Sequence, residues 1–100
     1  MVALVRPRFR LGQTVATPAA LEAIQQAGQS PAEFLDRHVR GDWGNLSADD
    51  RALNDEAVQD GSRILSAYVT RAGEKIWVIT EAADDRGHRS ATTILLPDEY

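Results

Sequence analysis

Three runs of alternating side chains in the C-terminal half decide the fold. They read ILSAYVT at residues 64–70, KIWVITEA at residues 75–82 and SATTILL at residues 90–96. β-Branched and aromatic residues with a period of two are typical of strands, and the polar segments between the runs predict hairpin connections. Consecutive strands with short connections pair antiparallel, so residues 62–97 are predicted to form a three-stranded meander with residues 75–82 at its centre.

Capping residues predict three helices ahead of the meander. The expected N-caps are Thr17, Ser30 and Ser47. Glu33 stands where it completes a capping box with Ser30, so a second helix is expected over residues 31–40. Gly28 and Gly61 are placed to end the first and third helices. The third helix has few apolar positions and is expected to lie mostly in solvent.

These elements predict one α+β domain over residues 1–100. Residues 17–60 form its helical half and residues 62–97 its meander, and the helices pack on one side of an antiparallel sheet of three to four strands. Residues 8–16 alternate as well, with Gly12 at a position suited to a bulge, and are the candidate for an added edge strand.

Composition excludes several classes of function. The 100 residues contain no cysteine, which removes disulfides, thiolate nucleophiles and cysteine metal sites and suits a cytoplasmic protein. A net charge of −4 argues against direct binding to nucleic acid. Neither a signal peptide nor a membrane anchor is expected, because no stretch approaches the length of apolar sequence that a membrane span needs. It also has no glycine-rich phosphate loop or metal-ligand spacing, so no cofactor and no metal are expected.

The acidic charge gathers in one segment. Residues 41–60 carry six acidic residues against one arginine, whereas residues 1–10 carry three arginines and no acid. An acidic surface steers a basic partner, including one that itself handles nucleic acid. The predicted partner-binding residues are Asp42, Trp43, Asp49, Asp50, Asp55 and Glu56. For Trp43, two alternatives stay open, an exposed contact or a staple that holds its turn to the body.

A catalytic alternative uses His38, Arg63 and Tyr68. Cleavage of RNA without a metal needs a base, a cation for the phosphorane and a proton donor, and these three side chains supply such groups. The competing interpretation is structural, with His38 packed on the apolar face of its helix and Tyr68 as a cross-strand aromatic. In that interpretation Arg63 and Arg89 are solvated charges and Trp77 is a sheet aromatic.

A third alternative is self-association. If the strand over residues 90–96 is at the sheet edge, it can pair with a second copy across a two-fold axis, so the chain is expected to be a monomer or a homodimer.

The chain resembles a family of small proteins of about this length from plasmids, phages and other mobile elements. The resemblance rests on His38, residues 41–44, Asp50, Asn54, Gly61, Arg63, Ser66, Tyr68, residues 76–81 and residues 92–100. It implies a protein carried on mobile elements. Together with the acidic segment over residues 41–60 and the lack of a catalytic signature, it leads us to expect an accessory protein that binds another macromolecule, such as a host or defence component. The loop over residues 82–89 is longer than in the family pattern. The order of helices before strands is also similar to the RelE and barnase-like ribonucleases, in topology alone.

Overall fold

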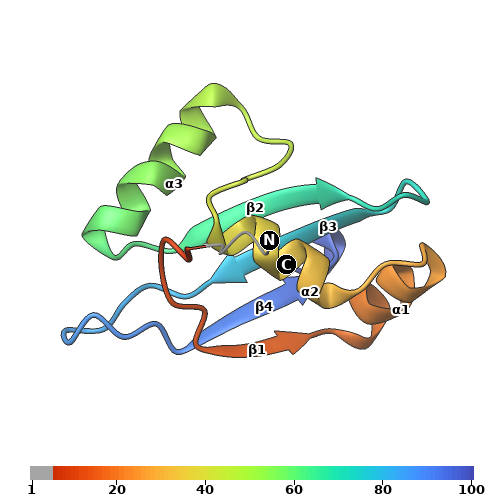
Figure 1. Ribbon diagram of the computed structural model, residues 1–100, viewed down its shortest axis with the longest axis horizontal. Coiled ribbons are helices and arrows are strands. Elements are labelled where there is room, and N and C mark those ends of the chain that lie inside the picture. Colours follow the sequence, from red (N-terminus) through yellow and green to blue (C-terminus); the bar gives the residue numbers. More distant parts are fainter. Residues whose placement is uncertain (1–5) are drawn as a thin grey trace, which may run out of the picture.

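The computed structural model describes residues 6–100 and confirms the α+β class, with three α-helices before the meander (Figure 1). The elements are, in order, β1 (Gln13–Ala16), α1 (Pro18–Gln26), α2 (Pro31–Val39), α3 (Ala48–Asp60), β2 (Ile64–Val69), β3 (Lys75–Thr80), β4 (Ala91–Leu95) and the 3-10 helix η1 (Pro97–Glu99). No helix within residues 6–100 is both long and apolar enough to span a membrane.

The sheet has the strand order β1-β4-β3-β2. β2, β3 and β4 form the predicted antiparallel meander, but β1 joins β4 in parallel, so the sheet is mixed rather than wholly antiparallel. Parallel neighbours need a long connection, and all three helices and two strands separate β1 from β4 in the chain. β4 is therefore an interior strand, and the prediction that residues 90–96 offer a free edge is wrong.

β1 begins later than the predicted range 8–16 because Gly12 turns the chain. This glycine has φ +67°, and a Cβ there would collide with the backbone of Arg89 and Ser90. Only glycine adopts such a conformation at such close approach without strain. The next residue, Gln13, donates its N–H to the Ser90 carbonyl at 3.0 Å and starts the pairing with β4.

The predicted helix caps are confirmed at two of three positions. Thr17 accepts from the Ala20 N–H, Ser47 accepts from the Asp50 N–H, and Gly61 ends α3 in the left-handed conformation. The capping box of α2 does not form, because Ser30 makes no side-chain cap. Instead the Glu33 carboxylate accepts from the Gln29 side chain.

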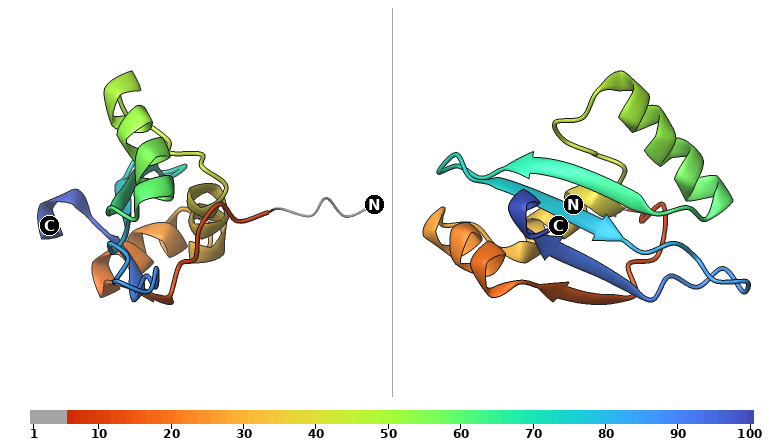
Figure 2. Two further views of the ribbon diagram at one scale, coloured as in Figure 1. Left: turned by 90° about the vertical axis from the view of Figure 1, so that its left-hand side faces the viewer. Right: turned by 180° about the vertical axis from the view of Figure 1, so that it is seen from behind.

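The two faces of the sheet are covered differently (Figure 2). α1 and α2 lie on one face, where Ile24 and Phe34 pack against strand residues including Tyr68 and Ile76. We call this the helix face. On the opposite face, the back face, only η1 and the C-terminal Tyr100 lie against the strands within residues 6–100. α3 lies on neither face but beyond the β2 edge.

The outer edge of β2 is sealed by side-chain and loop contacts. The Asn54 side chain of α3 donates to the Leu65 carbonyl at 2.7 Å and accepts from the Leu65 N–H at 3.2 Å, as a paired strand would. The Trp43 carbonyl and the Asn45 N–H bond the next outward residue, Ala67. Sealing of this kind protects an edge from pairing with other chains.

Candidate functional site

His38 is fully buried at the centre of a chain of polar side chains. Its Nδ1 lies 2.6 Å from the Ser66 hydroxyl and its Nε2 lies 2.8 Å from the Thr80 hydroxyl. Thr80 in turn contacts the Thr92 hydroxyl at 2.6 Å, and Thr92 donates to the Leu11 carbonyl at 2.7 Å. This chain, which we call the His38 network, connects α2, three strands and the segment before β1.

The direction of every bond in the His38 network follows from counting protons. Because Thr92 gives its only proton to the Leu11 carbonyl, Thr80 must donate to Thr92. Thr80 then accepts from His38, which places the imidazole proton on Nε2 and leaves Nδ1 to accept from Ser66. The network is complete only with a neutral histidine. Consistently, burial first and the positive charge of Arg89 second lower the pKa of His38 to about 3.

The three residues of the catalytic alternative do not form a common site. His38 and Tyr68 are buried on the helix face, and the Tyr68 hydroxyl donates to the Asp42 carbonyl at 2.6 Å. Burial raises the pKa of Tyr68 above its usual value. Arg63 instead contacts the ring and hydroxyl of Tyr100 beside the back face. No substrate reaches a fully buried base, so the ribonuclease interpretation of these residues is not supported by their positions.

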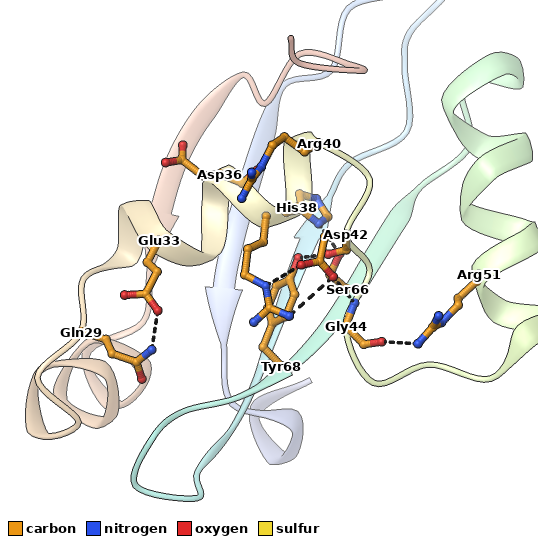
Figure 3. A network of polar contacts seen from close by, with 11 residues as sticks. Gln29, Glu33, Asp36, His38, Arg40, Asp42, Gly44, Arg51, Ser66 and Tyr68 are labelled. Atoms are coloured by element: carbon orange, nitrogen blue, oxygen red, sulfur yellow. Dashed lines mark hydrogen bonds and ion pairs between the residues drawn. The ribbon is translucent and has the colours of Figure 1, made fainter. Parts of the chain in front are cut away.

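Two of the five predicted partner-binding carboxylates are used within the molecule. Asp42, beside Tyr68 and Gly44 in Figure 3, accepts from Arg37 at 2.7 Å, and this bond lowers the pKa of Asp42. Asp55 accepts from the Trp43 indole at 3.1 Å and from Arg8 at 3.3 Å. Asp42 and Asp55 are therefore part of the structure's own bonding, which the sequence did not predict.

Trp43 holds its turn to the body of the protein. Only 4% of it is exposed, and its ring lies 6.1 Å from Phe9 and 5.9 Å from His38 between centroids. Of the two alternatives, the structure shows the second: the packed Trp43 side chain fixes its turn to the body of the protein. The prediction of Trp43 as an exposed contact residue is corrected, since its side chain offers almost no surface to a partner.

The remaining acidic side chains lie on the outer surface of α3. Asp49, Asp50 and Glu56 are exposed, and none of them forms a salt bridge within residues 6–100. The acidic surface that faces solvent is thus smaller than the sequence suggests, and it belongs to one helix.

A groove joins this acidic helix to the back face of the sheet. It has a volume of about 490 Å³, with Leu53 and Asp50 of α3 on one side and Leu65, Ala67 and Trp77 at its floor. A second hollow of about 320 Å³ continues from Ala67 and Trp77 toward Val69 and Pro97. Together we call them the back-face groove. Volumes of this size are ordinary for ligand-binding clefts.

All large apolar side chains found exposed within residues 6–100 lie along the back face. Leu53 is 61% exposed, Tyr100 62%, and Val15 and Val69 43% each. Val15 belongs to this face because it pairs with Thr93, which pairs with Ile79 and through it with Leu65. Strand alternation in the sequence indicated a semi-apolar second face, but the exposure of Leu53 and the open groove depend on where α3 lies.

Arg89, expected to be solvated, is a buried anchor. It is 8% exposed and donates to the carbonyls of Ser62 and Glu81 at 2.8 and 3.0 Å and to that of Ala57 at 2.8 Å. Burial lowers the pKa of Arg89, while nearby Asp60 acts in the opposite direction. Because Ala57 lies in the last turn of α3, this guanidinium ties the helix end to the sheet.

Comparisons with known proteins add nothing to these residues: no protein-family model, no curated protein and no solved structure matches the chain.

Proposed function

We propose that this protein is a binding domain that captures a basic, amphipathic segment of a protein partner in the back-face groove. The observation that carries the proposal is the gathering of exposed apolar side chains on the one face of the sheet that no α-helix covers within residues 6–100. Scattered apolar residues are normal on surfaces, but Leu53 and Val69 both line the back-face groove, and apolar side chains gathered at a groove are typical of an interaction site.

The charge of the partner follows from the rim of the groove. Asp50 lines it, and Asp49 and Glu56 lie on the same exposed helix. A partner segment with Leu or Phe on one side and Lys or Arg on the other would bury the first in the groove and place the second beside α3. Carboxylates at a rim accelerate association more than they add to affinity.

We further propose that the protein is cytoplasmic and acts as an accessory factor of a mobile element, in line with the family resemblance. Its partner is then a basic protein of the host, including one that handles nucleic acid. The absence of cysteine suits the cytoplasm.

The test uses two synthetic helical peptides of equal length, one with a leucine face and lysines opposite, the other with glutamates in place of the lysines. Titration of the unmodified protein is followed by amide and indole NMR shifts. We expect the lysine peptide to shift Leu53, Leu65, Ala67 and the Trp77 indole, and the glutamate peptide to shift none of them. Shifts outside the groove, or none with either peptide, contradict the proposal.

Two variants separate the apolar and acidic contributions. Leu53→Gln removes the apolar wall and is expected to weaken peptide binding about tenfold. Asp50→Asn is expected to weaken it less, and more at low salt than at high salt. Asp85→Asn, the same change in the exposed loop between β3 and β4, is the matched control and leaves binding unchanged.

A further inference from the structure

The two edges of the sheet differ in whether their backbone groups have partners. At β2, Asn54 and residues 43–45 occupy the outward N–H and C=O groups of Leu65 and Ala67. At the other edge, no segment of residues 6–100 pairs with the outer side of β1. Unpaired edges are templates for another strand, and proteins usually block them.

The residues that face outward on β1 are Thr14 and Ala16. Gln13 and Thr17 donate their N–H groups to Ser90 and Ile94 of the β4 side, at 3.0 Å each. Because backbone groups alternate in direction along a strand, the N–H and C=O groups of Thr14 and Ala16 point away from β4. Both residues thus offer a donor and an acceptor at the open edge.

β1 lacks the charged side chains and the proline that block many sheet edges. Its four residues, Gln13–Ala16, include no charged side chain and no proline. Val15 is 43% exposed on the back face. On the helix face, a shallow hollow of about 210 Å³ between Ala16, Leu35 and Pro31 adjoins the same edge.

We propose that a second copy of this chain pairs with β1 through an antiparallel, two-fold symmetric contact centred on Val15. Thr14 of each copy then faces Ala16 of the other, and each such pair exchanges both of its N–H···O=C bonds. The two Val15 side chains meet across the axis, where cross-strand neighbours approach closely. The two sheets become one continuous sheet across the dimer.

The lack of charge on β1 favours a second copy of the chain at this edge over a basic partner of the kind proposed for the back-face groove. The chain carries a net charge of −4, so two copies repel wherever their acidic surfaces approach. β1 itself carries no charge, and the Glu99 carboxylate beside its C-terminal end is bonded to the Thr17 hydroxyl and the Leu96 N–H, so the strand brings no unpaired like charges together. Small uncharged side chains at positions 14 and 16 fit opposite each other in a self-complementary contact.

The first measurement is the solution mass of the unmodified protein by sedimentation equilibrium over a wide concentration range. We expect the mean mass to rise from the chain's 11.0 kDa toward twice that value. Amide hydrogen exchange at Thr14 and Ala16 should slow as concentration rises, while exchange at Val69 should not change. If the mean mass remains that of a single chain at every concentration, the proposal is overturned. The β1 edge would then be open only to a strand from another protein.

Three variants locate the contact. Ala16→Pro removes an outward N–H without touching a bond to β4, and Val15→Lys places a charge on the axis. Both are expected to remain monomeric at concentrations where the unmodified protein dimerises, with an unchanged Tm measured in dilute solution. Val69→Lys is the matched control, because this valine has the same 43% exposure on the sealed edge strand, and it should dimerise normally.

If Val69→Lys no longer dimerises, or if Val15→Lys still dimerises, the contact lies on another surface. Either result overturns the inference. The exchange measurement on the unmodified protein covers the case in which a variant does not fold. No peptide partner takes part, so these results are independent of the proposed function.

Discussion

The helix face and the back face of the sheet are built from the same strands, yet the first encloses polar side chains beside its apolar core, whereas the second leaves apolar side chains exposed. On the helix face, the polar side chains of His38, Ser66 and Thr80 are fully buried, and the two hydroxyls are bonded to the two ring nitrogens of His38. On the back face, Val69 remains exposed to solvent, as does Leu53 of α3 at the rim of the groove. A buried polar group is stable only when its bonds are complete, so the helix face is rigidly specified, whereas the back face is available for binding.

The largest effect that tests this comparison is expected at Arg89. Arg89→Met should destabilise the fold by about 3 kcal/mol, because the Ala57 carbonyl loses its charged donor in a buried contact and the carbonyls of Ser62 and Glu81 lose theirs in partly buried ones. Arg86→Met in the same loop is exposed and should change the free energy of unfolding by less than about 0.5 kcal/mol. Urea unfolding measures both, and equal effects would mean that the Arg89 contacts contribute nothing specific.

The same substitution on the two faces gives the sharpest contrast. Thr80→Val leaves the His38 Nε2–H without an acceptor and is expected to cost about 2 kcal/mol. Thr93→Val, on the back face of the neighbouring strand, keeps the shape and the strand preference and should be neutral within about 0.5 kcal/mol. Denaturant midpoints compare the two, and similar losses would remove the distinction between the faces.

Lowering the pH should reduce the free energy of unfolding, because His38 is buried as a neutral side chain on the helix face. In the folded protein its pKa is about 3, below the ordinary value near 6.5, so between these values the unfolded chain binds a proton that the native state does not. The stabilisation is present above pH 6.5 and falls with pH, by up to about 1.4 kcal/mol per pH unit.

The free energy of unfolding between pH 7 and 5 measures this dependence. Replacing His38 by Gln should flatten it, while His88→Gln, in an exposed loop, should leave the slope as it is. A slope that survives His38→Gln would show that other groups cause the acid sensitivity.

The smallest effect on stability is expected on the back face. Leu53→Gln keeps a good helix former at a position that is 61% exposed, so Tm should move by little, with a free-energy change within about 0.5 kcal/mol. A large loss would place Leu53 in the core and argue against its availability to a partner.

Local patterns in the sequence were sufficient to predict the helices and strands, but not the contacts that their side chains make. Strand alternation correctly placed Ile64, Ser66 and Tyr68 on one face. Thr17 and Ser47 begin helices and Gly61 ends one, as predicted. The capping box at Ser30 failed because Gln29 competes for the Glu33 carboxylate. Charge counting found the acidic helix but not the pairing of Asp42 with Arg37 or of Asp55 with the distant Arg8.

By itself the sequence determined the α+β class, the antiparallel meander and the acidity of α3, because periodicity, caps and composition act over neighbouring residues. Tertiary structure alone decided that β1 joins β4 in parallel and that Asn54 seals the β2 edge while β1 stays open. It also decided that His38 is neutral and enclosed and that a groove lies between α3 and the back face. These outcomes depend on contacts between residues far apart in the chain, whose pairing no local pattern encodes.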